Sequence, residues 1–211
     1  MQKICALAVL LTLATGGAIA DVPVGSVAVY SDGGVEKLLS RTDGKSLWED
    51  DRKRRYLRTD NPILPVRERS NFLDGHGYVQ TVIEGQPENY RKLAVGQRLE
   101  FTLRRNYRDG KTATRMWDCE YRGARQGKVL DRPRTLQRYV CERFIIHRKL
   151  HNRSFRERRV IAFSEELGMV VDLQRTTRKR TSSRKLVALL PPSKATYKTL
   201  RTLVRKIRKG K

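Results

Sequence analysis

The residues best able to do acid–base chemistry in this sequence are a few histidines and glutamates. His76 lies in Asp74-Gly75-His76-Gly77, a glycine-flanked turn that could present an imidazole in a cleft as a general base. A single histidine between glycines is more often a plain loop residue. We assign no catalytic residue, and a hydrolase that uses His76 is the third of three functional hypotheses.

A second pair, His147 and His151, has the i, i+4 spacing that lets two imidazoles share a metal ion on a helix. It lacks the adjacent glutamate of a metalloprotease, and the surrounding bases would repel a cation. Glu165 and Glu166 are adjacent, and neighbouring side chains on a strand point to opposite faces. The sequence therefore predicts no metal site and no cofactor.

Cys119 and Cys141 remain when Cys5, near the N-terminus, is set aside. They form no C-x-x-C motif and have no nearby histidine pair, which argues against a thiol oxidoreductase or a zinc site. An even number of cysteines in an oxidising compartment favours a disulfide, worth about 3 kcal/mol for a loop of roughly 23 residues. Two buried free thiols are the alternative.

The N-terminus indicates that compartment. Residues 1–20 read MQKICALAVLLTLATGGAIA, in which Lys3 precedes an uncharged run and Ala18-Ile19-Ala20 ends it. This pattern predicts a secretory signal peptide cleaved after Ala20. A transmembrane anchor is the alternative, but the run falls short of the roughly 20 residues that span a bilayer. We expect a soluble periplasmic protein.

The charge of the chain predicts anionic partners. Its 211 residues include 46 Lys+Arg against 22 Asp+Glu, a formal net charge of +24. Residues 174–211 hold seven arginines, seven lysines and no acid, which is more than half of this excess. Export and the absence of a recognised nucleic-acid-binding motif argue against a nucleic-acid partner in vivo.

The elements that must position these residues resemble β-strands joined by turns. Apolar residues mostly recur at every second position, and Gly or Asp-Gly signals interrupt them. The expected strands are 26–30, 35–41, 46–50, 54–59, 78–83, 97–107, 112–121, 136–147, 154–163 and 169–175. We predict a mainly β domain over 21–175, an antiparallel meander that forms a sandwich or half-barrel.

Alternation assigns faces to the central strands. Leu99, Phe101 and Leu103 share one face, as do Trp117, Cys119 and Tyr121 on the returning strand after Asp109-Gly110. Tyr139 and Cys141 share a face of the next strand. The predicted disulfide would then join two strands of one sheet, or two facing sheets.

Residues 176–211 are expected to form a basic linker and one amphipathic helix. Ser193 could cap a helix over 194–208, with apolar residues at helical spacing. Such a helix can lie on an anionic bilayer, or its apolar stripe can pack on the sheet. The candidate anion-binding residues are Arg178, Lys179, Arg180, Arg184, Lys185, Lys198, Arg201, Arg205, Lys206 and Arg208.

Several short motifs resemble a class of exported proteobacterial proteins with a β-rich domain and no established activity. They span about 25–175 and comprise Tyr30-Ser31-Asp32-Gly33-Gly34, Asn61-Pro62 followed by Pro65, Leu93–Gly96, Trp117 with Cys119, Tyr139 with Cys141, and Phe163-Ser164-Glu165-Glu166-Leu167-Gly168. The class usually has Pro in place of Glu165, and Trp-Pro-Leu in place of Arg91-Lys92-Leu93. The resemblance implies a β-rich fold and export, and it transfers no catalytic residue.

These observations support one leading hypothesis and one alternative. The leading hypothesis is a non-enzymatic periplasmic protein that binds anionic envelope lipid or polymer through its basic C-terminal tail, with peripheral membrane contact. The alternative is a periplasmic carrier or assembly factor that holds an apolar ligand or a client protein in a curved β-sheet. A cavity lined by Leu99, Phe101 and Leu103 would favour the alternative. The oligomeric state is left open.

Overall fold

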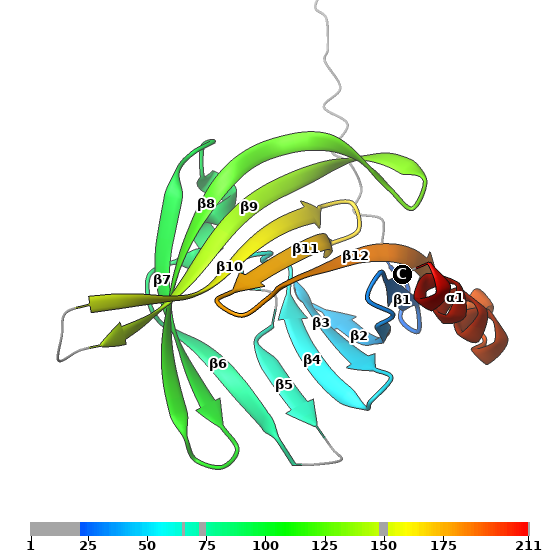
Figure 1. Cartoon of the computed structure of the whole chain (residues 1–211), viewed down its shortest axis with the longest axis horizontal. Helices are drawn as coiled ribbons and strands as arrows, with labels where there is room; N and C mark the ends of the chain where they lie inside the picture. The colour runs from blue at the N-terminus through cyan, green and yellow to red at the C-terminus, as the bar shows by residue number, and fades with distance from the viewer. Residues whose placement is uncertain (1–21, 65, 72–74, 148–151, 211) are drawn as a thin grey trace, which may run out of the picture.

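The computed structural model describes residues 22–64, 66–71, 75–147 and 152–210. Twelve antiparallel strands form one closed barrel, in which each strand pairs with the next along the chain and β12 pairs with β1 (Figure 1). The mainly β, antiparallel prediction is confirmed. The expected sandwich or half-barrel is replaced by full closure, which gives both edges of every described strand a partner.

Every strand predicted from the sequence is present, and β5 and β12 are additional. The strands are β1 (Val27–Tyr30), β2 (Val35–Thr42), β3 (Lys45–Asp50), β4 (Arg54–Thr59), β5 (Glu68–Asn71), β6 (Gly77–Glu84), β7 (Arg98–Tyr107), β8 (Thr112–Val129), β9 (Arg132–His147), β10 (Asn152–Ser164), β11 (Met169–Thr177) and β12 (Thr181–Leu190). The helices are η1 (Pro87–Lys92), η2 (Pro192–Lys194) and α1 (Tyr197–Lys209).

The longest hairpin, β8–β9, extends further than the sequence predicts. Leu130 and Asp131 have φ angles of 53° and 63°, so two left-handed residues reverse the chain between the strands. Pro133 then lies inside β9 opposite Lys128, rather than in the expected loop. Residues around this turn are mostly polar, so the strand ends lack the apolar alternation that predicts a strand.

The expected linker at 176–185 is instead part of a hairpin. Thr176 and Thr181 pair across β11 and β12, and β12 continues until Leu190 lies opposite Val27. The boundary predicted at residue 175 therefore falls within the barrel, and the last strand lies beyond it. The prediction failed because the run of Thr, Ser, Arg and Lys lacks the apolar alternation of a half-buried strand.

The predicted C-terminal helix is confirmed as α1. Thr196 caps it in place of Ser193, and its hydroxyl accepts a hydrogen bond from the Thr199 amide. The helix lies against β1 on the outside of the barrel (Figure 1). Val27 and Val29 on the outer face of β1 are buried, and the apolar stripe of α1 is half-buried except for the exposed Tyr197. The stripe therefore packs on the sheet, and the bases of α1 face solvent.

Two apolar clusters fill part of the interior. One contains Phe101, Trp117, Tyr139, Ile161 and the two cysteines. The predicted disulfide is confirmed between Cys119 and Cys141, which lie opposite each other on β8 and β9 with a Cα–Cα distance of 4.0 Å. The shared faces predicted for these strands are therefore correct.

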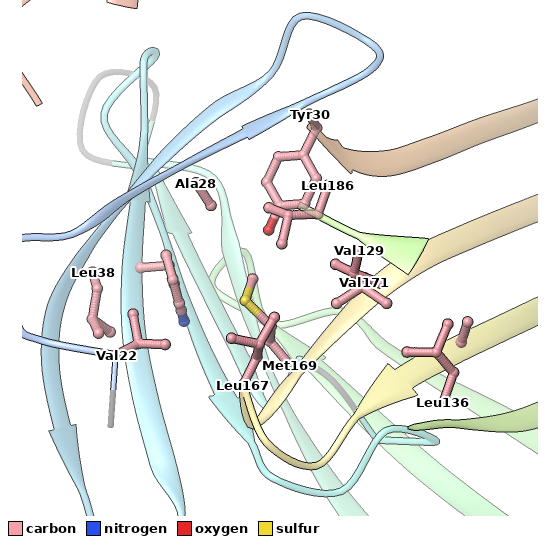
Figure 2. Packing of buried hydrophobic residues seen from close by; sticks show 12 residues of the cluster. Val22, Ala28, Tyr30, Leu38, Val129, Leu136, Leu167, Met169, Val171 and Leu186 are labelled. Carbon is pink, nitrogen blue, oxygen red and sulfur yellow. The ribbon is translucent and has the colours of Figure 1, made fainter. Parts of the chain in front are cut away.

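The second cluster lies where the barrel closes. Tyr30 of β1 and Leu186 of β12 are paired across the closing strands and pack together (Figure 2). Leu38 and Met169 belong to the same cluster. Closure of the barrel is thus accompanied by burial of apolar side chains from both ends of the chain.

The signal peptide and its predicted cleavage after Ala20 lie outside the described residues. Within the described ranges, none of the helices has the length and apolar character needed to cross a membrane.

Candidate anion-binding sites

Arginine side chains line a large part of the barrel interior. Alternation carries them there, because Arg105 follows the buried Leu103 on β7, and Arg159 precedes the buried Ile161 on β10. Eight strands already give an interior that side chains just fill, so a twelve-stranded barrel suits long ones. We call the set the lumen arginines: Arg58, Arg105, Arg115, Arg143, Arg159, Arg175 and Arg184.

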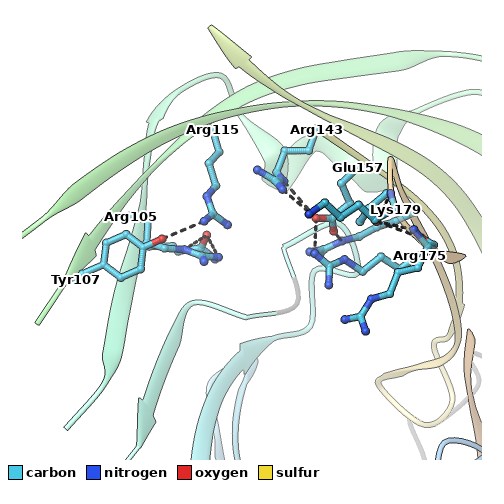
Figure 3. Close-up of polar contacts among 11 residues, drawn as sticks. Arg105, Tyr107, Arg115, Arg143, Glu157, Arg175 and Lys179 are labelled. Carbon is cyan, nitrogen blue, oxygen red and sulfur yellow. Dashed lines mark hydrogen bonds and ion pairs between the residues drawn. The ribbon is translucent and has the colours of Figure 1, made fainter. Parts of the chain in front are cut away.

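Glu157 binds three of them at once. Its side chain is 1% exposed and accepts hydrogen bonds from Arg143 Nη2 at 3.1 Å, Arg175 Nη2 at 2.9 Å and Arg159 Nε (Figure 3). Burial alone would raise the pKa of Glu157. The charge of Arg159 and the hydrogen bonds from Arg175 and Arg159 outweigh burial and hold the pKa at about 2. Glu157 is therefore ionised at neutral pH.

Glu36 forms a second centre. Arg58 donates two hydrogen bonds to its carboxylate, at 2.8 and 2.9 Å, and Arg184 Nη1 donates a third at 2.9 Å. The Arg184 guanidinium also stacks 3.7 Å from the centroid of the Tyr30 ring. Burial opposes ionisation of Glu36, but Arg58 and Arg184 lower its pKa to about 2.

Arg105 and Arg115 bind neutral groups instead. Arg115 Nη2 donates to the Tyr107 hydroxyl at 3.0 Å, and Arg105 donates twice to Gln80 Oε1, at 3.2 and 2.9 Å (Figure 3). Neither forms an ion pair with a carboxylate of the described residues. Burial and the charges of Arg105 and Arg143 lower the pKa of Arg115 to about 10. This part of the lumen therefore carries uncompensated positive charge.

A cavity of about 300 Å³ lies in the lumen next to Glu36. Its walls combine the aromatic rings of Tyr30, Trp48 and Tyr56 with Ile161 and Leu173. Four lumen arginines also line it, namely Arg58, Arg159, Arg175 and Arg184. The lining suits a small ligand that has both an apolar part and an anionic group.

Three buried nitrogen atoms near the cavity make no hydrogen bond to a described residue. They are Trp117 Nε1, Arg175 Nε and Arg184 Nε. The Trp117 side chain is 5% exposed, and the Arg159 guanidinium stacks over its ring at 4.6 Å. Buried donors normally find an acceptor, because an unmade hydrogen bond costs about 1–3 kcal/mol. These donors are suited to an acceptor that a ligand would bring.

The candidate residues predicted in the tail do not form one surface. Arg184 was wrongly placed there, because alternation along β12 turns it into the lumen, where it binds Glu36. The other nine side chains are exposed. Arg178, Lys179 and Arg180 lie in or beside the β11–β12 turn, and Lys185 lies on β12. The remaining five are on α1, and Arg208 lies near the β1–β2 turn at Gly33.

His76 lies in a groove of about 540 Å³ with Tyr78, Arg105, Tyr107 and Asp109. The Asp109 carboxylate accepts hydrogen bonds from the Lys111 amide and ammonium, at 3.1 and 2.9 Å. The described residues that line this groove include no serine, threonine or cysteine to act as a nucleophile. A hydrolase that uses His76 therefore stays a prediction without a complete site.

The other candidates for chemistry are not assembled into a site either. His151 lies outside the described residues, and His147 is the last residue of β9. Glu166 forms an ion pair with Arg134. Within the described parts of the chain, no group of three or more His, Cys, Asp or Glu side chains could hold a metal ion.

The sequence analysis missed both buried glutamates and six of the lumen arginines. A usable signal was present, because Arg105, Arg115 and Arg143 each lie two residues from one of the shared faces predicted for the central strands. Extending the alternation by one step would have placed them in the lumen. Sequence alone gives little reason to expect them inside, because charged residues are rarely buried unless they are paired, and the partners lie on other strands.

Comparison with protein-family models and with curated proteins gives no match. Among solved structures, the chain is similar to the crystal structure of the hypothetical lipoprotein YmcC from Escherichia coli (K12). The two share 10% sequence identity with a TM-score of 0.49, over 82% of this chain and 89% of that chain. A likeness this weak carries no argument about function.

Proposed function

We propose that the protein is a periplasmic carrier whose barrel holds a small amphiphilic anion in its lumen. The observation that supports this proposal is the cavity of about 300 Å³ between aromatic walls and four arginines. Its volume lies at the lower end of the usual range for ligand pockets, so the ligand is small.

The charge of the lumen determines the ligand class. Five of the seven lumen arginines bind the two buried carboxylates, Glu36 and Glu157, and the other two bind neutral groups. A buried charge without a partner is costly, and an anionic ligand would offset part of that cost. A purely apolar ligand, as the sequence suggested, would leave the charge uncompensated. Phe101 and Leu103 are buried in the core, so they do not line the cavity as that hypothesis required.

The test is to fill the cavity without changing any charge. Val170 lines the cavity, and Val187 is an exposed valine on β12. We would compare Val170→Trp with the matched control Val187→Trp by calorimetric titration with dodecyl phosphate and dodecanoate. Dodecyl maltoside serves as an uncharged probe. Circular dichroism establishes that both variants are folded.

For each anionic probe, we expect the native protein and Val187→Trp to have the same affinity. Neither should bind dodecyl maltoside. Val170→Trp should lose at least tenfold in affinity, because its indole occupies the space of the ligand. Equal binding by both variants would place the ligand elsewhere and overturn the carrier function. Binding of the maltoside as tightly as the anions would overturn the anionic part of the proposal.

A second candidate function, attachment to an anionic bilayer, rests on α1. Six basic side chains lie on this helix, which carries no acid. Because the apolar stripe packs on β1, such attachment is electrostatic rather than insertive. Cosedimentation with phosphatidylglycerol vesicles tests it with Arg201→Glu/Arg205→Glu, against Thr112→Glu/Thr114→Glu on β8 as control. A truncation after residue 175 is unsuitable because it removes β12.

We expect the α1 variant to leave the vesicle pellet and the control to remain in it. High salt should release the native protein, since exposed charges are screened. Pelleting of the α1 variant like the native protein would refute this function. Binding to isolated cell-wall polymer but not to vesicles would refute the lipid as the partner.

A further inference from the structure

Two of the lumen arginines, Arg105 and Arg115, have no carboxylate partner among the described residues. The positive charges of Arg105 and Arg143 both oppose that of Arg115, which places the three guanidiniums near one another. Figure 3 shows Arg115 and Tyr107 on one side of the lumen and Arg143 with Glu157 on the other. The Arg143 hydrogen bonds to Glu157 use Nε and Nη2. The Arg115 hydrogen bond to Tyr107 uses Nη2. Each guanidinium therefore keeps further N–H groups for a ligand.

We propose that Arg105, Arg115 and Arg143 form a subsite for the phosphate monoester group of the ligand, with Tyr107 donating a further hydrogen bond. This inference rests on the proposed carrier function and names the anionic group of its ligand. The apolar part of the ligand extends past Arg159 into the cavity beside Trp48 and Tyr56.

The charge count favours a phosphate monoester over a carboxylate. A phosphate monoester carries about −1.5 to −2 charges at neutral pH and offers three acceptor oxygens. Arg105 and Arg115 have no carboxylate partner among the described residues, and Arg143 shares Glu157 with two other arginines. Together the three guanidiniums can engage all three oxygens through planar, two-pronged contacts. A carboxylate carries one charge and two oxygens, so it would leave most of this positive charge uncompensated.

Glu157 connects the subsite to the cavity. Its carboxylate binds Arg143 on the subsite side, and Arg159 and Arg175 on the cavity side. Arg159 in turn stacks over Trp117, and the described residues supply no hydrogen-bond acceptor for Trp117 Nε1. A ligand oxygen or a polar linker in this region would satisfy that donor.

The decisive variants are Arg115→Met and Arg115→Lys. Because Arg115 is half-buried beside like charges, an apolar side chain of similar length should leave the barrel folded. Arg125→Met, at an exposed position of the same strand, is the matched control. The probes are dodecyl phosphate, dodecyl sulfate, dodecanoate and inorganic phosphate, measured by calorimetry between pH 5.5 and 7.5.

We expect Arg115→Met to weaken dodecyl phosphate at least tenfold while dodecanoate changes less than threefold. Arg115→Lys should restore part of the loss, and Arg125→Met should behave as the native protein. Affinity of the native protein for dodecyl phosphate should rise with pH, because the monoester gains its second charge near pH 6. Dodecyl sulfate keeps one charge throughout, so it controls for any change of the protein itself across this pH range.

The outcomes separate this inference from the carrier function. If Arg115→Met binds dodecyl phosphate like the native protein with an unchanged pH profile, the subsite is wrong and the carrier function stands. Binding of dodecanoate but neither phosphate probe has the same meaning. If no anionic probe binds, the carrier function itself fails. Inorganic phosphate that binds as tightly as dodecyl phosphate supports the subsite and identifies free phosphate, rather than a lipid-like monoester, as its occupant.

Discussion

The lumen arginines and the lysines and arginines of α1 are basic side chains in two different environments. On α1, the basic side chains are exposed, and water and salt weaken their interactions. In the lumen, guanidiniums are held by Glu36, Glu157 and aromatic rings at fixed distances. The formal net charge of +24 therefore has two parts. One is surface charge that salt screens, and the other is buried charge whose removal changes the free energy of unfolding.

Lowering the pH should cause the largest loss of stability, and this loss should come from the buried ion pairs of the lumen rather than from α1. The pKa values of Glu36 and Glu157 are lowered from 4.5 to about 2, so both contribute stability above pH 4.5. This stability is lost as the pH falls from about 4.5 to about 2, on the order of 3 kcal/mol for each carboxylate. Urea denaturation at successive pH values measures it. A free energy of unfolding that stays constant down to pH 2.5 would contradict the assignment.

Glu157→Gln should destabilise the barrel by about 3–5 kcal/mol at pH 7, because three guanidiniums lose their shared carboxylate. Glu100→Gln removes a carboxylate from an ion pair with Arg153 in which both side chains are about half exposed. That control should change stability by less than about 0.5 kcal/mol. Similar losses for both variants would show that burial makes no difference to these charges.

Replacing both cysteines measures the apolar part of the same interior. Cys119→Ala/Cys141→Ala should cost about 2–5 kcal/mol, since it removes the constraint on the unfolded chain. Because Arg159 binds Glu157 and lies opposite Cys141, the effect of the cysteine replacement should differ from simple addition to that of Glu157→Gln by more than about 0.5 kcal/mol. Chemical denaturation of the double, single and combined variants tests this. Simple addition would mean that the disulfide and the arginines act independently.

The smallest effect should come from the exterior helix. Lys206→Gln on α1 removes an exposed charge and should change the free energy of unfolding by no more than about 0.5 kcal/mol. Arg58→Gln, which breaks the pair with Glu36, should cost several kcal/mol more. Thermal denaturation of the two variants compares them directly. A large effect at Lys206 would show that the helix holds its charges in a specific structure.

Local patterns predicted the strands, and long-range pairing decided the rest. Asp109-Gly110 and the alternation of Leu99, Phe101 and Leu103 suffice to identify β7 and its turn. Closure depends on pairing between β1 and β12, and β12 has no alternation to mark it. The lumen depends on the number of strands, because a narrower barrel would have no room for arginines. Neither the strand number nor its effect on burial can be read from one segment.

The short β1 strand has a consequence for the order in which the barrel forms. Its pairing with β12 joins residues from opposite ends of the described chain, so loop-closure entropy delays this contact relative to the hairpins. β1 has four residues, whereas β8 has 18. We expect this seam to close last and to open first, with amide hydrogens at Val27 and Val29 exchanging faster than those around Cys119. The docked α1 would then act as a latch that slows local opening, independently of any ligand.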